Sequence, residues 1–375
     1  MHIRMMNYIF LLIFLILSYL LLYRINVRNK KRIFLIFSFL GLSFLSCFRD
    51  FSVGADTQQW VDFYTVYGAQ GLNAVNFSQP HEPGYVLLNV ILWQFSHNPR
   101  LLIIFGGLFI NFSFCYFVDK HSKDPFLSVL IWYCFRMFFG SMCLFRQFLA
   151  ISIVLLSFDL LLHKKYIRFA FAVVIASMFH YIALAFLLLI PIRQIEKVNL
   201  KYAIIIALIF SICFLFLPQL VEFFLKYVSN YSDYFSYMQE NKIIVGEFHF
   251  QPFLFVFLAY MLPLAFSCYR RKDIFCKTDL TSTKMKSKKI ESYNFIMIIF
   301  IVIICLIALS SRLILISRIN EYFMPFVMLV PNIVDTNRNK ELKVYYIALN
   351  IAYFAYMLLA SNQFLTNDFH FFWES

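Results

Sequence analysis

Charged and polar residues interrupt this otherwise apolar chain at a few places, and their types suit reactions of an anionic substrate. A charge near the middle of a membrane costs at least about 2.5–3.5 kcal/mol on insertion scales, so each such residue is a functional candidate. These candidates are Arg49 with Asp56, His81 with Glu82, Arg146 with Gln147, Arg318 with Glu321 and Tyr322, and His180 by itself.

The arginines are the candidates for binding phosphate oxygens, because a guanidinium is a planar, permanently charged fork of donors. Arg146, followed by Gln147, opens an apolar segment with no acid nearby in the sequence. Its alternative role is an interfacial anchor that reaches lipid headgroups. Arg318, Glu321 and Tyr322 are spaced i, i+3 and i+4, which places them on one helical face. An internal ion pair is the alternative interpretation of that face.

Three other residues could handle a proton. Glu82 precedes Pro83 at the expected start of a helix, where it could serve as a cap or accept a proton from a hydroxyl nucleophile. His180 is either a hydrogen-bonded core histidine or a base and sugar-hydroxyl ligand. Asp56 lies in the polar stretch from Arg49 to Trp60, which follows an apolar helix.

The elements that position these residues are membrane helices. The chain is 62% hydrophobic and 14% charged, and apolar runs of about 20 residues recur from end to end. We expect an all-α polytopic integral membrane protein with about 10–12 transmembrane helices, forming a single integral membrane domain over residues 1–375. The predicted helices lie near 7–23 (a retained helix, not a signal peptide), 33–48, 101–118, 126–140, 146–162, 202–218, 250–269, 293–310, 319–334 and 343–360.

The distribution of positive charge sets the expected orientation. The net charge is +13, and 24 of the 33 Lys and Arg residues fall in six short loops, which excludes a nucleic-acid-binding surface and indicates cytoplasmic loops. These loops are 24–32, 119–124, 163–168, 193–201, 270–289 and 335–343. Alternation then places both termini and the loops 49–84, 219–249 and 311–318 on the outer side.

Two segments do not fit simple spans. Residues 85–95 are too short to cross, so we predict a re-entrant half-helix. Residues 167–192 have basic loops at both ends, which indicates two short spans broken near Met178-Phe179-His180. Broken helices are tolerated in membranes where they are buried in protein or line a wet cavity, so both segments predict one outward-facing cavity.

The sequence contains no motif of a soluble enzyme. Its eight cysteines have no paired spacing and are expected to pack inside spans. No dense cluster of carboxylates is present to hold a divalent ion beside a diphosphate, so we expect neither a metal nor another cofactor.

The ordered set of motifs resembles the EpsG family of Wzy-like bacterial polysaccharide polymerases. The resemblance covers about residues 45–335. It rests on Arg49 with Val53-Gly54-Ala55-Asp56-Thr57, Glu82-Pro83-Gly84-Tyr85, Arg146-Gln147 with Ala150, Phe179-His180, and Arg318 with Tyr322-Phe323. Ala55 departs from the family pattern, in which a Thr- or Ser-like residue often stands between the Gly and the Asp.

The resemblance implies a glycosyltransferase of the bacterial plasma membrane that joins undecaprenyl-diphosphate-linked oligosaccharide repeats at the outer face. The products would be O-antigen, capsule or exopolysaccharide, and no nucleotide sugar would be needed. Arg49, Arg146 and Arg318 would stabilise the departing lipid diphosphate, and Glu82, Asp56 or His180 would orient or deprotonate the acceptor hydroxyl. Gln147, Glu321 and Tyr322 are further substrate-binding candidates. The expected partners are the lipid-linked donor and acceptor, the bilayer, and a chain-length regulator and flippase of the same pathway.

Three alternatives remain open. A glycan ligase of the O-antigen ligase type would show the same chemistry. A lipid-linked oligosaccharide flippase or transporter would also bury charges, but should contain repeated halves, and no repeat is found. A membrane acyltransferase would place its reactive histidine towards a cytoplasmic acyl donor.

Overall fold

The computed structural model describes residues 5–25, 28–76, 81–195, 284–310, 314–334, 340–359 and 369–374. These residues are almost entirely helical, apart from one isolated antiparallel bridge between Arg49 and Phe371. The predicted all-α polytopic class is therefore confirmed. The predicted helices at 202–218 and 250–269 and the loop 219–249 lie outside the described residues.

The chain separates into two compact units, which we describe one at a time. Unit 1 contains Met1–Leu187 with Met328–Ser375, and unit 2 contains Leu188–Val327. The expectation of a single integral membrane domain stays a prediction.

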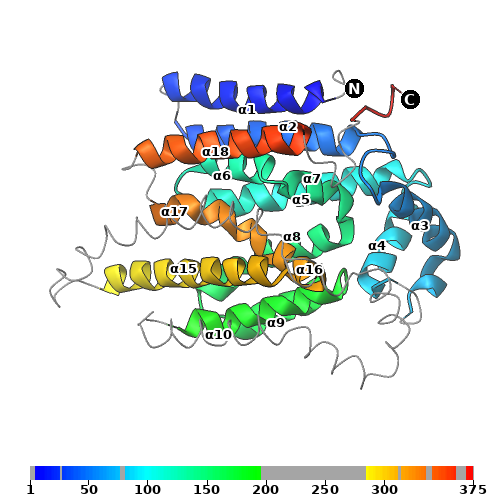
Figure 1. Cartoon of the computed structure of the whole chain (residues 1–375). Helices are drawn as coiled ribbons and strands as arrows, with labels where there is room; N and C mark the ends of the chain where they lie inside the picture. The colour runs from blue at the N-terminus through cyan, green and yellow to red at the C-terminus, as the bar shows by residue number, and fades with distance from the viewer. Residues whose placement is uncertain are drawn as a thin grey trace. The chain divides into compact units, whose positions relative to one another are not determined.

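Among its described residues, unit 1 holds five helices that are long and apolar enough to cross a membrane. They agree with the predicted spans to within a few residues: α1 (Met6–Arg24), α2 (Lys30–Phe48), α5 (Arg100–His121), α8 (Phe145–Leu162) and α18 (Lys340–Leu359). Helix α2 packs against α1 and α5, and α5 packs against α8 (Figure 1). Their lengths follow from the bilayer, since about 20 residues at 1.5 Å per residue cover its hydrocarbon core.

The predicted helix at 126–140 is broken in the structure. Helices α6 (Pro125–Cys134) and α7 (Met137–Cys143) meet at an angle of 51°. Between them Arg136 adopts a left-handed backbone conformation with φ of 54°, which is uncommon for a residue with a side chain. Together the two helices can form one bent span, and α6 is buried along its length among α1, α2, α5 and α18.

The two segments that do not fit simple spans, 85–95 and 167–192, form short helices in the structure, as predicted. Helix α4 (Pro83–Trp93) has eleven residues, which is about 16 Å and roughly half a bilayer core. Helix α9 (Tyr166–Ser177) ends before the predicted break, and a 3₁₀ segment η2 (Tyr181–Leu188) follows it. The loop expected at 49–84 contains an additional helix, α3 (Thr57–Gln70), that packs against α4 (Figure 1).

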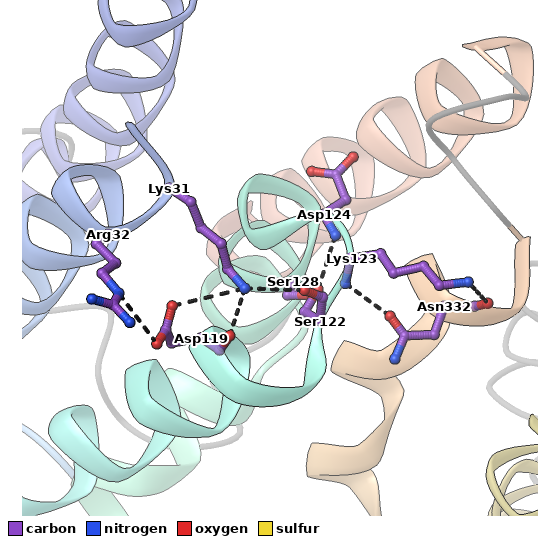
Figure 2. Close-up of polar contacts among 8 residues, drawn as sticks. All are labelled: Lys31, Arg32, Asp119, Ser122, Lys123, Asp124, Ser128 and Asn332. Carbon is purple, nitrogen blue, oxygen red and sulfur yellow. Dashed lines mark hydrogen bonds and ion pairs between the residues drawn. The ribbon is translucent and has the colours of Figure 1, made fainter. Parts of the chain in front are cut away.

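Four of the predicted basic loops gather at one end of unit 1. Lys31 forms an ion pair of 3.8 Å with Asp119, which ties the start of α2 to the end of α5 (Figure 2). Lys343 at the start of α18 pairs with Asp124 at 2.6 Å. His121 Nε2 lies 3.6 Å from Asp159 near the end of α8. The described residues in or next to the loops 24–32, 119–124, 163–168 and 335–343 therefore share an end, as the positive-charge pattern predicts.

The opposite end of unit 1 brings together distant parts of the chain. The ring of Tyr8 lies 5.0 Å from that of Phe369, and the backbone N–H of Asp50 donates to His370 O at 2.9 Å. The described ends of the chain and the Arg49 segment thus lie at one end of unit 1, where the predicted alternation places them. Which side of the membrane this end faces stays a prediction.

Unit 2 contributes three described helices and most of a 3₁₀ segment. Helix α15 (Lys284–Ser310) packs against α10 (Leu189–Gln194) and α16 (Ile314–Phe323). Helix α15 begins inside the predicted basic loop 270–289, and α16 begins inside the predicted loop 311–318. The predicted helix at 319–334 is divided among α16, η5 (Met324–Leu329) and α17 (Val330–Val334), the last of which belongs to unit 1.

Candidate functional site

The polar stretch after α2 caps the end of α7. A helix leaves its last four carbonyl groups without partners inside the helix, so these need donors from elsewhere. Met142 O accepts from Arg49 Nη2 at 3.1 Å and from Thr57 Oγ1 at 3.4 Å. Cys143 O accepts from the indole nitrogen of Trp60 at 3.2 Å. The motif from Arg49 to Trp60 therefore fixes the chain where the bent span ends and α8 begins.

Arg49 is buried in this cap. Its side chain also donates to Ser46 O, and its own carbonyl accepts from the Arg100 guanidinium. Gly54 has a φ of +101°, and a Cβ there would lie 2.8 Å from Thr57 Oγ1, so only glycine fits this turn. The guanidinium of Arg49 is thus bonded to backbone carbonyl groups, which gives it a positioning role in the structure.

Arg146 forms a buried ion pair with Glu82. Arg146 Nη1 donates to Glu82 Oε2, and the two side chains are only 19% and 6% exposed. The guanidinium carbon lies 5.1 Å from the ring centre of Trp60 and 5.8 Å from that of Tyr85. A cation in the first turn of α8 is opposed by the helix dipole, so the Glu82 carboxylate offsets an unfavourable placement.

The helix start that carries Glu82 docks on the break after α9. The backbone N–H groups of Gly84 and Tyr85 donate to Met178 O at 2.8 and 3.2 Å. Glu82 Oε1 accepts from the backbone N–H of Tyr181 at 3.2 Å. A Cβ at Gly84 would lie 2.8 Å from Met178 O, so this approach requires glycine. The two segments that the sequence marks as irregular therefore meet directly, and His180 lies beside this junction.

His81 occupies an aromatic pocket next to the ion pair. Its Nδ1 lies 2.6 Å from the Tyr67 hydroxyl, and its ring centre lies 4.1 Å from that of Phe63. Burial, and to a smaller extent the charge of Arg146, lowers the pKa of His81 to about 4. His81 is therefore a neutral hydrogen-bonding group near pH 7.

The remaining candidates of unit 1 lie at the same end. Asp56 directly precedes α3, and its side chain makes no capping hydrogen bond there. Gln147 follows Arg146 on α8 and is buried. His180 is half-buried, and its carbonyl accepts from the Ala183 N–H at 2.9 Å. The structure thus brings Arg49, Asp56, Glu82, Arg146, Gln147 and His180 to one end of unit 1.

Arg318, Glu321 and Tyr322 lie on α16 in unit 2. Glu321 and Tyr322 are buried, whereas Arg318 is exposed. Because they belong to the other compact unit, their predicted place in the site stays a prediction.

Sequence reasoning did not single out the aromatic side chains that surround the ion pair. Trp60, Phe63 and Tyr67 follow one another at i, i+3 and i+7, which is one face of α3. That face covers His81, while Tyr85 comes from α4. The i, i+3, i+7 spacing of these residues could have indicated an aromatic helix face. No helix is predicted from the sequence over 57–70, so the spacing could not be interpreted in this way.

Within the described ranges, no three His, Cys, Asp or Glu residues are grouped so that they could hold a metal ion. The expectation of no metal concerns the whole chain and stays a prediction.

Comparison with known proteins supplies one match. The family model of the EpsG family matches residues 32–371, which is most of the chain. This match confirms the resemblance indicated by the motifs. No curated protein and no solved structure matches.

Proposed function

This chain belongs to the EpsG family, and from that premise we propose that it is a Wzy-type polysaccharide polymerase. It would join undecaprenyl-diphosphate-linked oligosaccharide repeats into O-antigen, capsule or exopolysaccharide. The family and the apolar helices indicate a membrane protein of polysaccharide biosynthesis. The observation that carries the finer proposal is the buried Arg146–Glu82 pair beside the rings of Trp60 and Tyr85.

Arg146 is the residue we assign to the diphosphate. Its Nε is buried and has no hydrogen-bond partner among the residues that the structure describes, so Glu82 does not satisfy every donor of the guanidinium. The first turn of α8 adds the positive end of a helix dipole to the same place. A preorganised cation of this kind stabilises charge that develops on a leaving group.

In the proposed reaction the bond between the donor's anomeric carbon and its diphosphate oxygen breaks. A new bond forms between that carbon and the acceptor hydroxyl oxygen. The electron pair leaves with the lipid diphosphate, whose charge Arg146 would stabilise. The hydroxyl proton would pass to Glu82 or His180, with Asp56 as the third candidate.

Glu82 would have two roles in this scheme. In the free protein it holds Arg146 through one carboxylate oxygen and accepts from the Tyr181 N–H through the other. A diphosphate bound to Arg146 would compete for the guanidinium, which would release the carboxylate to the acceptor hydroxyl. The ion pair would thus couple the arrival of the donor to the availability of the base.

The side chains around the ion pair are aromatic and buried. The rings of Trp60 and Tyr85 meet edge to face with their centres 5.8 Å apart, which encloses the Arg146 guanidinium in an apolar environment. Gln147 is assigned to binding the lipid-linked substrates, and Arg49 to holding the α7 end in place. Arg318, Glu321 and Tyr322 of α16 stay substrate-binding candidates of unit 2. The site would face outward from the bacterial plasma membrane, where both lipid-linked substrates are presented and where a flippase and a chain-length regulator would act.

The test is glycan chain length on a gel, in cells that lack the protein and are complemented at matched expression. We expect wild type to restore long chains, and Arg146→Gln and Glu82→Gln to leave single repeats that are still exported. Lys120→Gln is the matched control, because Lys120 is an exposed cation at the opposite end of α5.

Each other outcome changes the assignment. Lipid-linked repeats that accumulate unexported would indicate a flippase. Long chains that form but are not transferred to their final acceptor would indicate a ligase. Normal chains from both site variants would refute the role of the ion pair.

A further inference from the structure

A second polar region lies at the basic end of unit 1, away from the candidate site. A pocket of about 210 Å³ opens there between α1, α2, α18 and the start of α6. One water molecule needs only about 10–15 Å³ on this measure, so the pocket has room for a larger group. Its charged lining consists of Lys30, Lys31, Lys123 and Lys343 against one carboxylate, Asp124.

The pocket's lysines are held in place by the fold. Lys343 Nζ contacts Asp124 at 2.6 Å and donates to the Tyr19 hydroxyl at 3.2 Å. Lys31 Nζ contacts the carbonyl groups of Asp119 and Ser122, as Figure 2 shows. These contacts fix two of the ammonium groups beside the cavity.

The other two lysines are more exposed but are also oriented. Lys123 Nζ donates to Asn332 O at 3.1 Å, and its backbone N–H donates to Asn332 Oδ1 at 2.9 Å (Figure 2). Lys30 Nζ lies 5.5 Å from the ring centre of Tyr23. An ammonium group has three donors, so these four cations form a preset concave site for an anion.

The apolar lining indicates what kind of anion fits. The rings of Tyr19 and Phe126 stack with their centres 4.0 Å apart in the pocket wall, and Leu22 and Phe34 complete it. Along α1 next to the pocket, Leu20 and Leu21 are 49% and 59% exposed. A cationic pocket continuous with an exposed apolar helix face matches a molecule that carries both a phosphate and hydrocarbon chains.

We propose that this pocket binds the phosphate headgroup of an anionic phospholipid, with the acyl chains lying along α1. The site is separate from the Glu82–Arg146 pair and does not depend on the proposed polymerase activity. Its position at the basic end corresponds to the leaflet on the side of the positive loops.

The experiment measures binding to the full-length protein in a zwitterionic detergent by native mass spectrometry, with phosphatidylglycerol as the probe. We expect wild type to bind phosphatidylglycerol in preference to phosphatidylcholine of the same chain length. The variant Lys30→Gln/Lys123→Gln should bind it roughly thirtyfold more weakly, because each lysine near an anionic headgroup strengthens binding roughly fivefold. These two lysines are chosen because the other two hold ion pairs in the fold.

The control is Lys120→Gln, which removes an exposed cation at the same end that does not line the pocket. We expect it to bind phosphatidylglycerol like wild type. An equal loss in this variant would mean that general surface charge attracts the lipid, and equal binding of the two lipids by wild type would also overturn the proposal.

A competition experiment distinguishes a phospholipid from a soluble phosphate compound as the ligand of the pocket. Glycerophosphoglycerol carries the same phosphodiester headgroup without acyl chains. We expect it not to compete with phosphatidylglycerol at equal concentration. Full competition would assign the pocket to a soluble phosphate compound instead of a lipid.

Discussion

The Glu82–Arg146 pair should be energetically coupled far more strongly than an exposed ion pair, and a double-mutant cycle measures this. The variants are Glu82→Gln, Arg146→Gln and their combination. Two unit charges about 4 Å apart interact by about 4 kcal/mol at an effective dielectric constant of 20. Because Arg146 is 19% exposed, some of this is screened, and we expect a coupling energy of about 2–3 kcal/mol.

The two single variants should each destabilise the protein strongly. Removing one partner leaves the other charge buried and unpaired, which costs about 3–5 kcal/mol. Glu82→Ala should be worse than Glu82→Gln by about 1 kcal/mol, because glutamine keeps an oxygen that can accept from the Tyr181 N–H. The double variant should lose less than the sum of the two single losses.

The assay is unfolding by sodium dodecyl sulfate in mixed micelles, followed by tryptophan fluorescence. The pair Lys31–Asp119 provides an internal control, since its charges are 3.8 Å apart and its side chains are 39% and 25% exposed. The same cycle there should give less than about 1 kcal/mol. A Glu82–Arg146 coupling no larger than this control value would refute the buried ion pair.

Three further results are expected. Gly84→Ala should destabilise by at least about 1–3 kcal/mol in the same assay, because a Cβ would lie 2.8 Å from Met178 O; an unchanged midpoint would contradict the close approach. Trp60→Phe removes the donor to the end of α7, so we expect a loss of about 1–3 kcal/mol; a wild-type midpoint would show that this bond is dispensable. NMR of labelled His81 should give a pKa of about 4, below the ordinary 6.5. The neutral form of His81 therefore stabilises the fold above pH 6.5, and this stabilisation is lost as the pH falls from 6.5 to 4. Arg146→Gln should raise that pKa without restoring 6.5, because burial is the larger cause; an unchanged value would exclude the influence of Arg146.

The sequence was sufficient to predict the apolar helices of unit 1. The thickness of the bilayer sets their length, and the basic loops mark where they end. It also located the two irregular segments, since eleven residues cannot cross and since basic loops at both ends of 167–192 require a break. The bend at Arg136 was not predictable, because hydropathy is continuous through 126–140 and the left-handed residue there is not a glycine.

The candidate site was predicted in its residues but not in its connections. Polar side chains in apolar surroundings marked Glu82 and Arg146, yet they lie 64 residues apart, and nothing in the local sequence pairs them. The role of Arg49 was also not predictable, because its bond to Met142 O depends on where the bent span ends. Long-range backbone contacts of this kind leave no periodic signal.

The segment Phe369–Glu374 has a consequence for the order of folding. It supplies the bridge partner of Arg49, the imidazole that contacts Asp50 at 3.3 Å, and a ring beside the Arg100 guanidinium. The contact between Ser52 and His370 joins residues 318 positions apart. The Arg49 turn therefore inserts long before its partner is synthesised, and this end of unit 1 can become complete only after the last transmembrane helix of the unit is in place.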